Sequence, residues 1–456
     1  MSNQAENPSP VDEPDGTDLP RPTAPGESVP GYALSKAEVR RNMKAIVSRD
    51  AIFSTGCSAM AIVETPLWVF LGASSTQIGF IKSLSILGLI GMLASPYISA
   101  RFVYKRWYAF FAHVPYNACW GAMAVLLVLS PHFEWSNESL LTMMTILAGA
   151  NFFFAGFVSL PQQQFTAACI PMSYRGRHSA WAEGMGSATS IGITILGGWI
   201  LHSVLRPVSF GILYLIGWVF CQSAFVIGLF AREEPSQLNK EPRPSLRRIL
   251  TALKKDRPFL RLLLLYALFQ IFFFPIATVF VVNYGFKELA MAPEAASIIV
   301  LVISVAKILT AGPVGHLTDK LRPRRTLPFC ALLFSLSLLP VLVLENATGV
   351  FISCGLLAVT HICQSAAFNP LIFGLPRRVD RAGHYTTCHL VVTCSSSVGP
   401  LLIGWLCDLL SFRVTFLAVS LAAVALCPIA FFLLRGLSDA PRDALPDTTR
   451  FPDAPE

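Results

Sequence analysis

Charged residues are scarce in this sequence. Asp, Glu, Lys and Arg together make up 14% of the 456 residues, whereas 54% belong to the apolar set AVILMFWYC. A soluble globular protein carries about 25% charged residues, so this chain has too little charge to cover a water-facing surface of its size. The sequence therefore excludes a soluble protein and predicts an all-α integral membrane protein. Its 32 Pro and 30 Gly fit that class, because neighbouring helices satisfy the backbone groups that such residues free.

Several chemical patterns are missing as well. The sequence has no metal cluster, nucleotide-phosphate loop, catalytic triad or pair of hydrolase carboxylates, so we expect no enzyme, no cofactor and no metal. It also has no ATPase domain, so any transport would be driven by an ion or solute gradient. The N-terminus has no basic start followed by an apolar stretch, and we expect no cleavable signal peptide. The 11 Cys fall inside or at the ends of apolar stretches, where thiols usually act as small apolar residues, and a disulfide framework is not expected.

Long apolar runs dominate what is present. A helix needs about 20 apolar residues to cross the hydrocarbon core. Twelve stretches meet this length, and they fall into two sets of six. The first set is 47–71, 77–100, 107–130, 140–168, 179–203 and 209–231. The second set is 259–284, 294–317, 327–345, 349–375, 385–410 and 414–434.

The basic residues lie in alternate connections between these spans. One set of connections, together with the flanks of the first and last span, holds 27 Lys and Arg, and the other set holds only Arg206, Lys287 and Arg413. Loops rich in Lys and Arg stay in the cytoplasm. The net charge of +8 is therefore a topology signal and not a nucleic-acid site, and it predicts that both termini are cytoplasmic.

The chain divides into five segments. Residues 1–40 and 436–456 are rich in Pro and acids, which predicts disordered cytoplasmic tails. Residues 41–231 and 259–435 are the two six-helix halves. The connection 232–258 joins them, and its residues 246–255 have apolar side chains at helical spacing with bases between them, which predicts an amphipathic helix on the membrane surface.

The two halves repeat each other. Ser95-Pro96 followed by bases recurs as Gly312-Pro313 followed by bases, and Gly192 and Gly197 recur as Gly399 and Gly404. The offsets of 205 to 219 residues describe parallel copies, which pack about an axis along the membrane normal with a site between them.

One loop carries a family resemblance. The segment 315–325, which reads GHLTDKLRPRR, resembles the loop G-x-L-x-D-[RK]-x-G-[RK]-[RK] of the major facilitator superfamily and lies between spans eight and nine, as in that family. It departs from the pattern at Arg322 and Pro323. The corresponding loop of the first half, between spans two and three, has no Asp. The resemblance implies a twelve-helix transporter with a cavity lined by spans one, four, seven and ten. It also implies a conformational gate, whose residues here are Gly315, Asp319, Lys320, Arg324 and Arg325.

Charges inside a bilayer are costly and usually functional. Four lie well inside the spans, namely Glu64, Lys82, Glu183 and Lys307, and Asp408 lies at the outer end of span eleven. Lys307 is in the middle of span eight, where it either binds an anionic or hydroxyl-rich solute or pairs with a neighbouring acid.

Glu64 and Lys82 lie at similar depths. At ~1.5 Å per residue in antiparallel spans, both are roughly 8–10 Å below the outer edge. They either form one structural ion pair or include a proton carrier, Glu64, because burial raises the pKa of a carboxyl group toward neutrality. For Glu183 we expect a structural pair with a base of the 175–177 loop in preference to a role with the solute.

Neutral polar residues form a second group of candidates. Tyr266 and Gln270 share a face of span seven, His361 and Gln364 share a face of span ten, and Asn151 lies in span four. The resemblance favours these positions because the three spans would line the cavity. The alternative for each is a hydrogen bond that holds two helices together.

The sequence thus predicts a secondary transporter in the cell inner or plasma membrane. We expect it to move a small polar or anionic solute by alternating access, as a monomer in the lipid bilayer, in symport with protons or, as the alternative, with sodium. Two alternatives remain open at this point. One is a proton-driven exporter of amphipathic compounds, and the other is a non-transporting sensor or assembly protein on the same fold.

Overall fold

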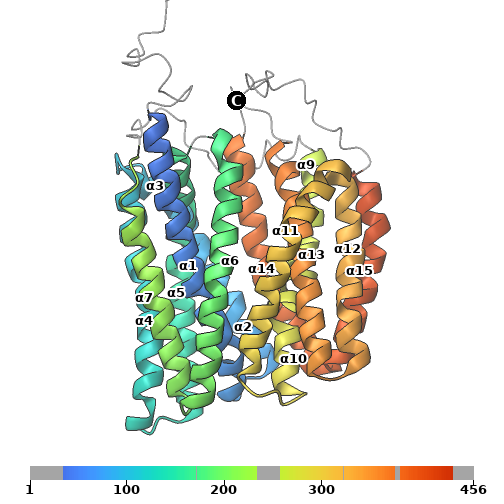
Figure 1. Ribbon diagram of the computed structural model, residues 1–456. Coiled ribbons are helices and arrows are strands. Elements are labelled where there is room, and N and C mark those ends of the chain that lie inside the picture. The colour runs from blue at the N-terminus through green and yellow to red at the C-terminus, as the bar shows by residue number, and fades with distance from the viewer. Residues whose placement is uncertain (1–33, 171, 234–256, 322, 375–380, 435–456) are drawn as a thin grey trace, which may run out of the picture.

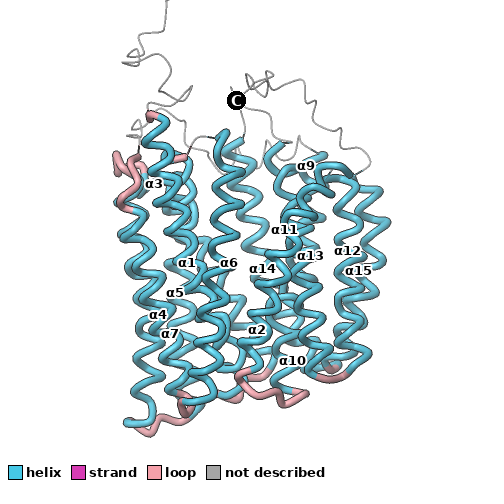
Figure 2. Tube along the Cα trace, viewed as in Figure 1, coloured by secondary structure: helices cyan, strands magenta, loops and turns pink. Residues whose placement is uncertain are grey.

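The computed structural model describes residues 34–170, 172–233, 257–321, 323–374 and 381–434. Within these ranges the chain is all helical, and twelve helices are long and apolar enough to cross a membrane (Figures 1 and 2). The twelve predicted spans are confirmed. The outer parts of the tails, most of the connection 232–258 with the helix predicted at 246–255, and the side chains of Asp319, Lys320, Arg324 and Arg325 lie outside the description.

The first half contains six spans. In chain order they are α1 (Lys36–Phe70), the three pieces α2 (Ser75–Ser83), η1 (Leu84–Leu87) and α3 (Gly88–Ser99), then α4 (Lys105–Leu129), α5 (Asn137–Cys169), α6 (Met172–Ser203) and α7 (Val208–Gly228). The second span is one continuous path that changes to a 3-10 turn at Leu84–Leu87. A second 3-10 turn, η2 (Ser130–His132), follows α4.

The second half also contains six. Its first span runs through α9 (Arg257–Pro275), the π-helical turn η3 (Ile276–Phe280) and α10 (Val281–Lys287). The others are α11 (Ala295–Leu321), α12 (Pro323–Leu344), α13 (Ala347–Gly374), α14 (Arg381–Leu410) and α15 (Phe412–Leu434).

Several helices extend beyond the apolar stretches. α1 begins at Lys36, inside the range 1–40 that we expected as a tail, because Ser35 and Glu38 form a capping box at its first turn. α6 begins at Met172, seven residues before the predicted span. Hydropathy marks where a helix meets lipid, whereas capping groups decide where the helix ends, so the two boundaries differ.

The bundle has two ends that differ in their connections. We call the end where α1 begins and α15 ends the tail end, and the opposite end, with its short loops, the loop end; these lie at the top and bottom of Figures 1 and 2. At the tail end the carboxylate of Glu233 accepts the backbone N–H groups of Lys105 at 2.7 Å and Arg106 at 2.9 Å, and so caps α4. Burial raises the pKa of Glu233, against the lowering effect of these two hydrogen bonds.

The halves meet through equivalent helices. α2, in the second span of the first half, packs against α14, the fifth span of the second half, and α6, the fifth span of the first half, packs against α11, the second span of the second half. This reciprocal pairing is what a twofold axis along the membrane normal predicts for parallel repeats.

The α2–α14 contact is close because of two glycines. A Cβ added to Gly79 would lie 2.2 Å from the carbonyl oxygen of Pro400, and one added to Gly404 would lie 2.3 Å from that of Ser75. Any larger residue would collide with backbone, so these two positions set how near the halves approach at the loop end.

Candidate functional site

Lys307 lies on the side of α11 that faces protein. Leu309 is 68% exposed and marks the outer, lipid-facing stripe of this helix. At 100° per residue, the Lys307 side chain lies about 160° around the helix axis from that of Leu309. Ser304 and Val314 are buried on the same side as Lys307, which is itself half-buried. Among the residues that the structure describes, no carboxylate lies within ion-pair distance of Lys307.

α13 and α9 supply polar neighbours in the same half. His361 is exposed on α13, and Gln364 is half-buried one turn further along. On α9, the ring centroid of Tyr266 lies 4.4 Å from that of Phe368 on α13. α11 and α13 pack together, so the structure brings these predicted residues to one side of the second half.

Glu183 is exposed on a side of α6 that is otherwise buried. Trp181 and Trp199, five turns apart, are 63% and 64% exposed and mark the lipid-facing stripe. Glu183 lies on the opposite side, which it shares with Leu201, five turns away and 2% exposed. A side chain that is exposed on the protein-facing side of a helix borders open space inside the bundle.

That space lies between the halves. On α6, Gly186 and Ser190 face α1, and the Ser190 hydroxyl accepts a hydrogen bond from the Ser58 hydroxyl of α1 at 2.8 Å. Gly198, further along α6, faces Ser297 of α11. Glu183 points between these two directions.

Our expectation for Glu183 was a pair with a base of the 175–177 loop. The side chains of that loop's bases lie outside the description, and that pairing is therefore untested. What the sequence did not show is that Glu183 points between α1 and α11, because this depends on which side of α6 packs against each of them.

Glu64 and Lys82 form an ion pair between α1 and α2. The Glu64 side chain is 39% exposed and that of Lys82 is 19% exposed. The structure thus joins two residues that the sequence placed at equal depth. The pair is nearer the loop end than Lys307, since Glu64 is six residues from the end of α1 and Lys82 seven from the start of α2.

Polar contacts between the halves gather at the loop end. Asp408 on α14 accepts from the backbone N–H of Ser75 at 3.1 Å and of Thr76 at 2.7 Å, and Lys287 lies 3.2 Å from the same carboxylate. The carboxylate therefore caps the first turn of α2, where the positive end of the helix dipole favours an anion. His202 and Glu294 add a longer contact of 3.8 Å.

Among the described residues, the tail end has fewer such contacts. Between described residues, the hydrogen bond of Gln163 with His389, at 3.4 Å, is the one that joins the halves there. Together these contacts describe a bundle that is held shut at the loop end.

Asn151 has a local role. It is buried, and its Nδ2 donates to the backbone oxygen of Tyr116 at 2.9 Å, which ties α5 to α4 within the first half. This is the helix-joining alternative that we gave for such residues. The gating segment 315–325 runs through the end of α11 and the start of α12, with residue 322 outside the description.

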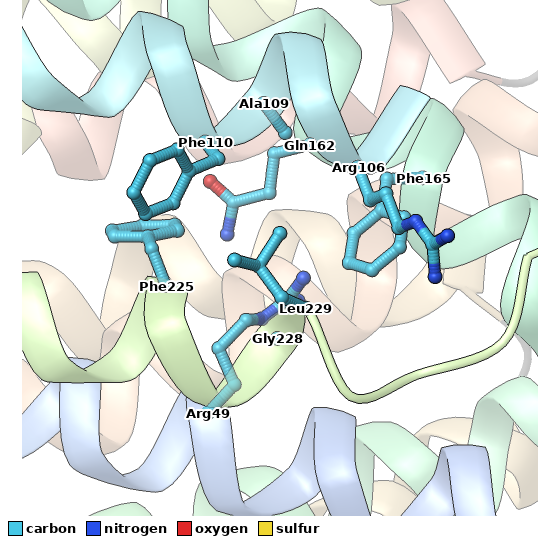
Figure 3. A pocket seen from close by; sticks show the side chains of 9 residues that line it. All are labelled: Arg49, Arg106, Ala109, Phe110, Gln162, Phe165, Phe225, Gly228 and Leu229. Carbon is cyan, nitrogen blue, oxygen red and sulfur yellow. The ribbon is translucent and has the colours of Figure 1, made fainter. Parts of the chain in front are cut away.

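A pocket opens inside the first half, near the tail end (Figure 3). Arg49 and Gln162 point into it. Its lining is Arg49, Arg106, Ala109, Phe110, Gln162, Phe165, Phe225, Gly228 and Leu229. All of these residues belong to the first half or directly follow α7, so the pocket is not part of the space between the halves.

Sequence reasoning missed the charges beside this pocket. Arg49 is buried, pairs with Asp50 at 2.7 Å and donates to Thr166 at 3.1 Å. His178 of α6 lies 3.0 Å from the other oxygen of Asp50. Because Arg49 is already paired, this network holds α1, α5 and α6 together. The signal available in the sequence was the presence of the charged residues Arg49 and Asp50 within the first span.

Comparisons with known proteins agree with this architecture. The family model described as Major Facilitator Superfamily matches residues 278–452. A search of curated proteins found no match to the sequence.

Solved structures with the same fold cover most of the chain. A POT family transporter in complex with 5-aminolevulinic acid has a TM-score of 0.66 at 11% identity, over 86% of this chain and 96% of that one. A bacterial homolog of the human lysosomal transporter Spinster, in an inward-facing and unoccupied conformation, has a TM-score of 0.63 at 13% identity, over 88% and 97%. The nucleoside transporter NupG has a TM-score of 0.59 at 12% identity, over 86% and 99%.

Proposed function

We propose that the chain is a secondary transporter of the major facilitator superfamily, which moves a small polar or anionic solute across an inner or plasma membrane by alternating access. The residues proposed to meet the solute are Lys307, His361, Gln364, Tyr266 and Gln270. All five belong to the second half, on helices α9, α11 and α13.

Lys307 is the observation that carries the proposal. A lysine in the middle of a span is costly unless it meets a partner or water. Lys307 faces protein on α11, is half-buried, and has no carboxylate partner among the described residues. A cation held in this way supports binding of an anionic or hydroxyl-rich group, and the structural alternative, a pair with a neighbouring acid, has no support from the described contacts.

We also propose which side of the membrane each end of the bundle faces. The tail end would be cytoplasmic, because the connections on that side hold 27 bases against 3 on the other. The contacts of Asp408 and Lys287 at the loop end then support a state closed to the outside. Rocking of the two halves would break these contacts and open the site to the other side.

Proton coupling is assigned to the Glu64–Lys82 pair. Protonation of Glu64 would remove the ion pair between α1 and α2, which gives the proton a way to alter the packing of the first half. The loop at 315–325 would act as a latch at the tail end, on the strength of its resemblance, and Asp319→Asn would slow turnover with solute affinity nearly unchanged.

Counterflow in proteoliposomes tests the function. We would screen a panel of metabolites for exchange and then compare Lys307→Met with the wild type for any solute that exchanges. Lys307→Met keeps an unbranched side chain and removes the charge, so exchange should fall below a tenth of the wild-type rate, with binding lost. Lys44→Met, an exposed lysine on α1, is the matched control and should leave exchange unchanged.

Two outcomes would contradict the proposal. If no solute of the panel exchanges, the chain is not a transporter of this class. If Lys307→Met exchanges normally, Lys307 does not bind the solute.

A further inference from the structure

Two opposite charges border the space between the halves, one contributed by each half. Glu183 belongs to α6 in the first half and Lys307 to α11 in the second. Each lies on the side of its helix away from the lipid-facing stripe, and among the described residues neither has an ion-pair partner. Since α6 and α11 pack against each other, the two charges face the same space.

Their separation follows from the register of the two helices. A Cβ at Gly198 would lie 3.3 Å from the Ser297 side chain, which places these residues at the same depth. Glu183 precedes Gly198 by 15 residues and Lys307 follows Ser297 by 10. Because α6 and α11 run in opposite directions, both charges lie on the tail-end side of this contact. At about 1.5 Å per residue, Glu183 lies roughly 7 Å nearer the tail end than Lys307. The charges are therefore offset along the bundle and leave room for a solute between them.

We propose that the solute is a small zwitterion, whose carboxylate binds Lys307 and whose ammonium group binds Glu183. The offset favours a molecule with its two charges several ångströms apart, of the size of an ω-amino acid or a dipeptide, over an α-amino acid. This rests on the proposed function and specifies the substrate class of the same site.

The arrangement also gives the solute a part in the conformational change. An unpaired charge that faces open space keeps its water, and a bound zwitterion replaces that water at both poles. Because Glu183 and Lys307 belong to different halves, a bound zwitterion links the halves through two charge-assisted contacts, whereas a simple anion contacts only the second half.

Matched probes separate the two charges. We would measure binding by isothermal titration calorimetry to the purified full-length protein with 5-aminovalerate, valerate and pentylamine. These probes share one carbon chain and carry both charges, only the carboxylate or only the ammonium group. 5-Aminovalerate should bind at least tenfold more tightly than either of the others, and tighter than glycine.

Single variants assign each pole. In Glu183→Gln, 5-aminovalerate should lose its advantage over valerate, while valerate binding is retained. In Lys307→Met, it should lose its advantage over pentylamine. Glu138→Gln, an exposed acid in the first turn of α5, is the matched control and should bind all three probes as the wild type does.

A charge swap guards against a variant that merely fails to fold. Glu183→Lys with Lys307→Glu restores both charges in reversed order, so it should regain 5-aminovalerate binding that each of the two single swaps lacks. Failure of the double swap to bind, with an unchanged elution volume in size-exclusion chromatography, would overturn the zwitterion assignment.

The failures of the two proposals differ. If Glu183→Gln binds 5-aminovalerate as well as the wild type does, or if no zwitterion binds while some other solute exchanges in a Lys307-dependent way, this inference is wrong and the transporter proposal stands. If no solute exchanges in counterflow, the transporter proposal itself falls.

Discussion

Asp408 holds Thr76 across the boundary between the two halves. One carboxylate oxygen of Asp408 accepts both the backbone N–H of Thr76, at 2.7 Å, and its hydroxyl, at 2.8 Å. A residue near the end of the eleventh span thus caps a helix in the second span, 332 positions away in the sequence. This contact stabilises the closed loop end.

Asp408→Asn should weaken that closure. The asparagine keeps the shape but loses the charge that favours the N-terminus of α2 and pairs with Lys287. Hydrogen bonds to a charged group contribute about 1.5–3 kcal/mol, so the open population at the loop end should rise roughly tenfold or more. Spin labels at Ser136 and Ala347, one in each half at the loop end, would report longer distances by pulsed electron paramagnetic resonance, in a background without native cysteines.

The control for this variant is Glu138→Gln, which also removes an acidic charge at the loop end but lies in the first turn of α5. It should leave the distance distribution unchanged. An unchanged distribution in Asp408→Asn itself would mean that other contacts close the loop end.

Adding a single methyl group at the crossing of α2 and α14 should open the same end. In Gly79→Ala the new Cβ would lie 2.2 Å from the Pro400 oxygen, which belongs to backbone and cannot move aside without separating the helices. The same label pair should therefore show a shift to longer distances, and thermal stability should fall despite the higher helix propensity of alanine.

Gly184→Ala and Gly192→Ala serve as controls, since a Cβ at either position meets nothing within 4 Å. They should leave the distances unchanged and raise the melting temperature slightly, because alanine favours the helix. If Gly79→Ala behaves like these two variants, α2 and α14 do not limit the approach of the halves.

Sequence patterns predicted the spans because each one needs a long apolar run, and they placed Glu64 and Lys82 at one depth because depth follows from counting residues along a helix. They did not predict that Asp408 caps α2 or that Arg49, Asp50 and His178 meet, because such contacts depend on how distant helices pack. Glu183 shows the same limit. Its position in span five was clear, but the side of α6 that faces the second half became known only from the packing against α1 and α11.

The distribution of bases predicts the sidedness of both ends. Cysteines introduced near Ser136 and Ala347 should react with a membrane-impermeant maleimide added outside intact cells, whereas one at Ser236 should react only after the membrane is permeabilised. The reason is the excess of Lys and Arg in the tail-end connections, since connections rich in these residues generally stay in the cytoplasm. Labelling of position 236 from outside would invert the assignment and, with it, the side to which the loop end is closed.

Glu64→Gln tests the coupling assignment. Glutamine resembles the protonated acid permanently, so it removes the ion pair with Lys82 and fixes the first half in its proton-loaded form. Exchange of solute at equal pH on both sides needs no net proton movement and should persist. Accumulation driven by a pH gradient should be lost, because Glu64 can no longer release a proton. Both activities would be measured in proteoliposomes made from one preparation, after sodium dependence has been checked.

The double variant Glu64→Gln with Lys82→Met distinguishes a role of the pair in proton coupling from a purely structural role. If Glu64 and Lys82 only hold α1 against α2, then Glu64→Gln leaves Lys82 without its partner in a half-buried site, which is costly, and both exchange and accumulation fail. Adding Lys82→Met removes that unpaired charge and should then restore both activities. Coupling predicts the opposite for the double variant: exchange without accumulation. Accumulation against a gradient in either variant would show that the proton travels by another group.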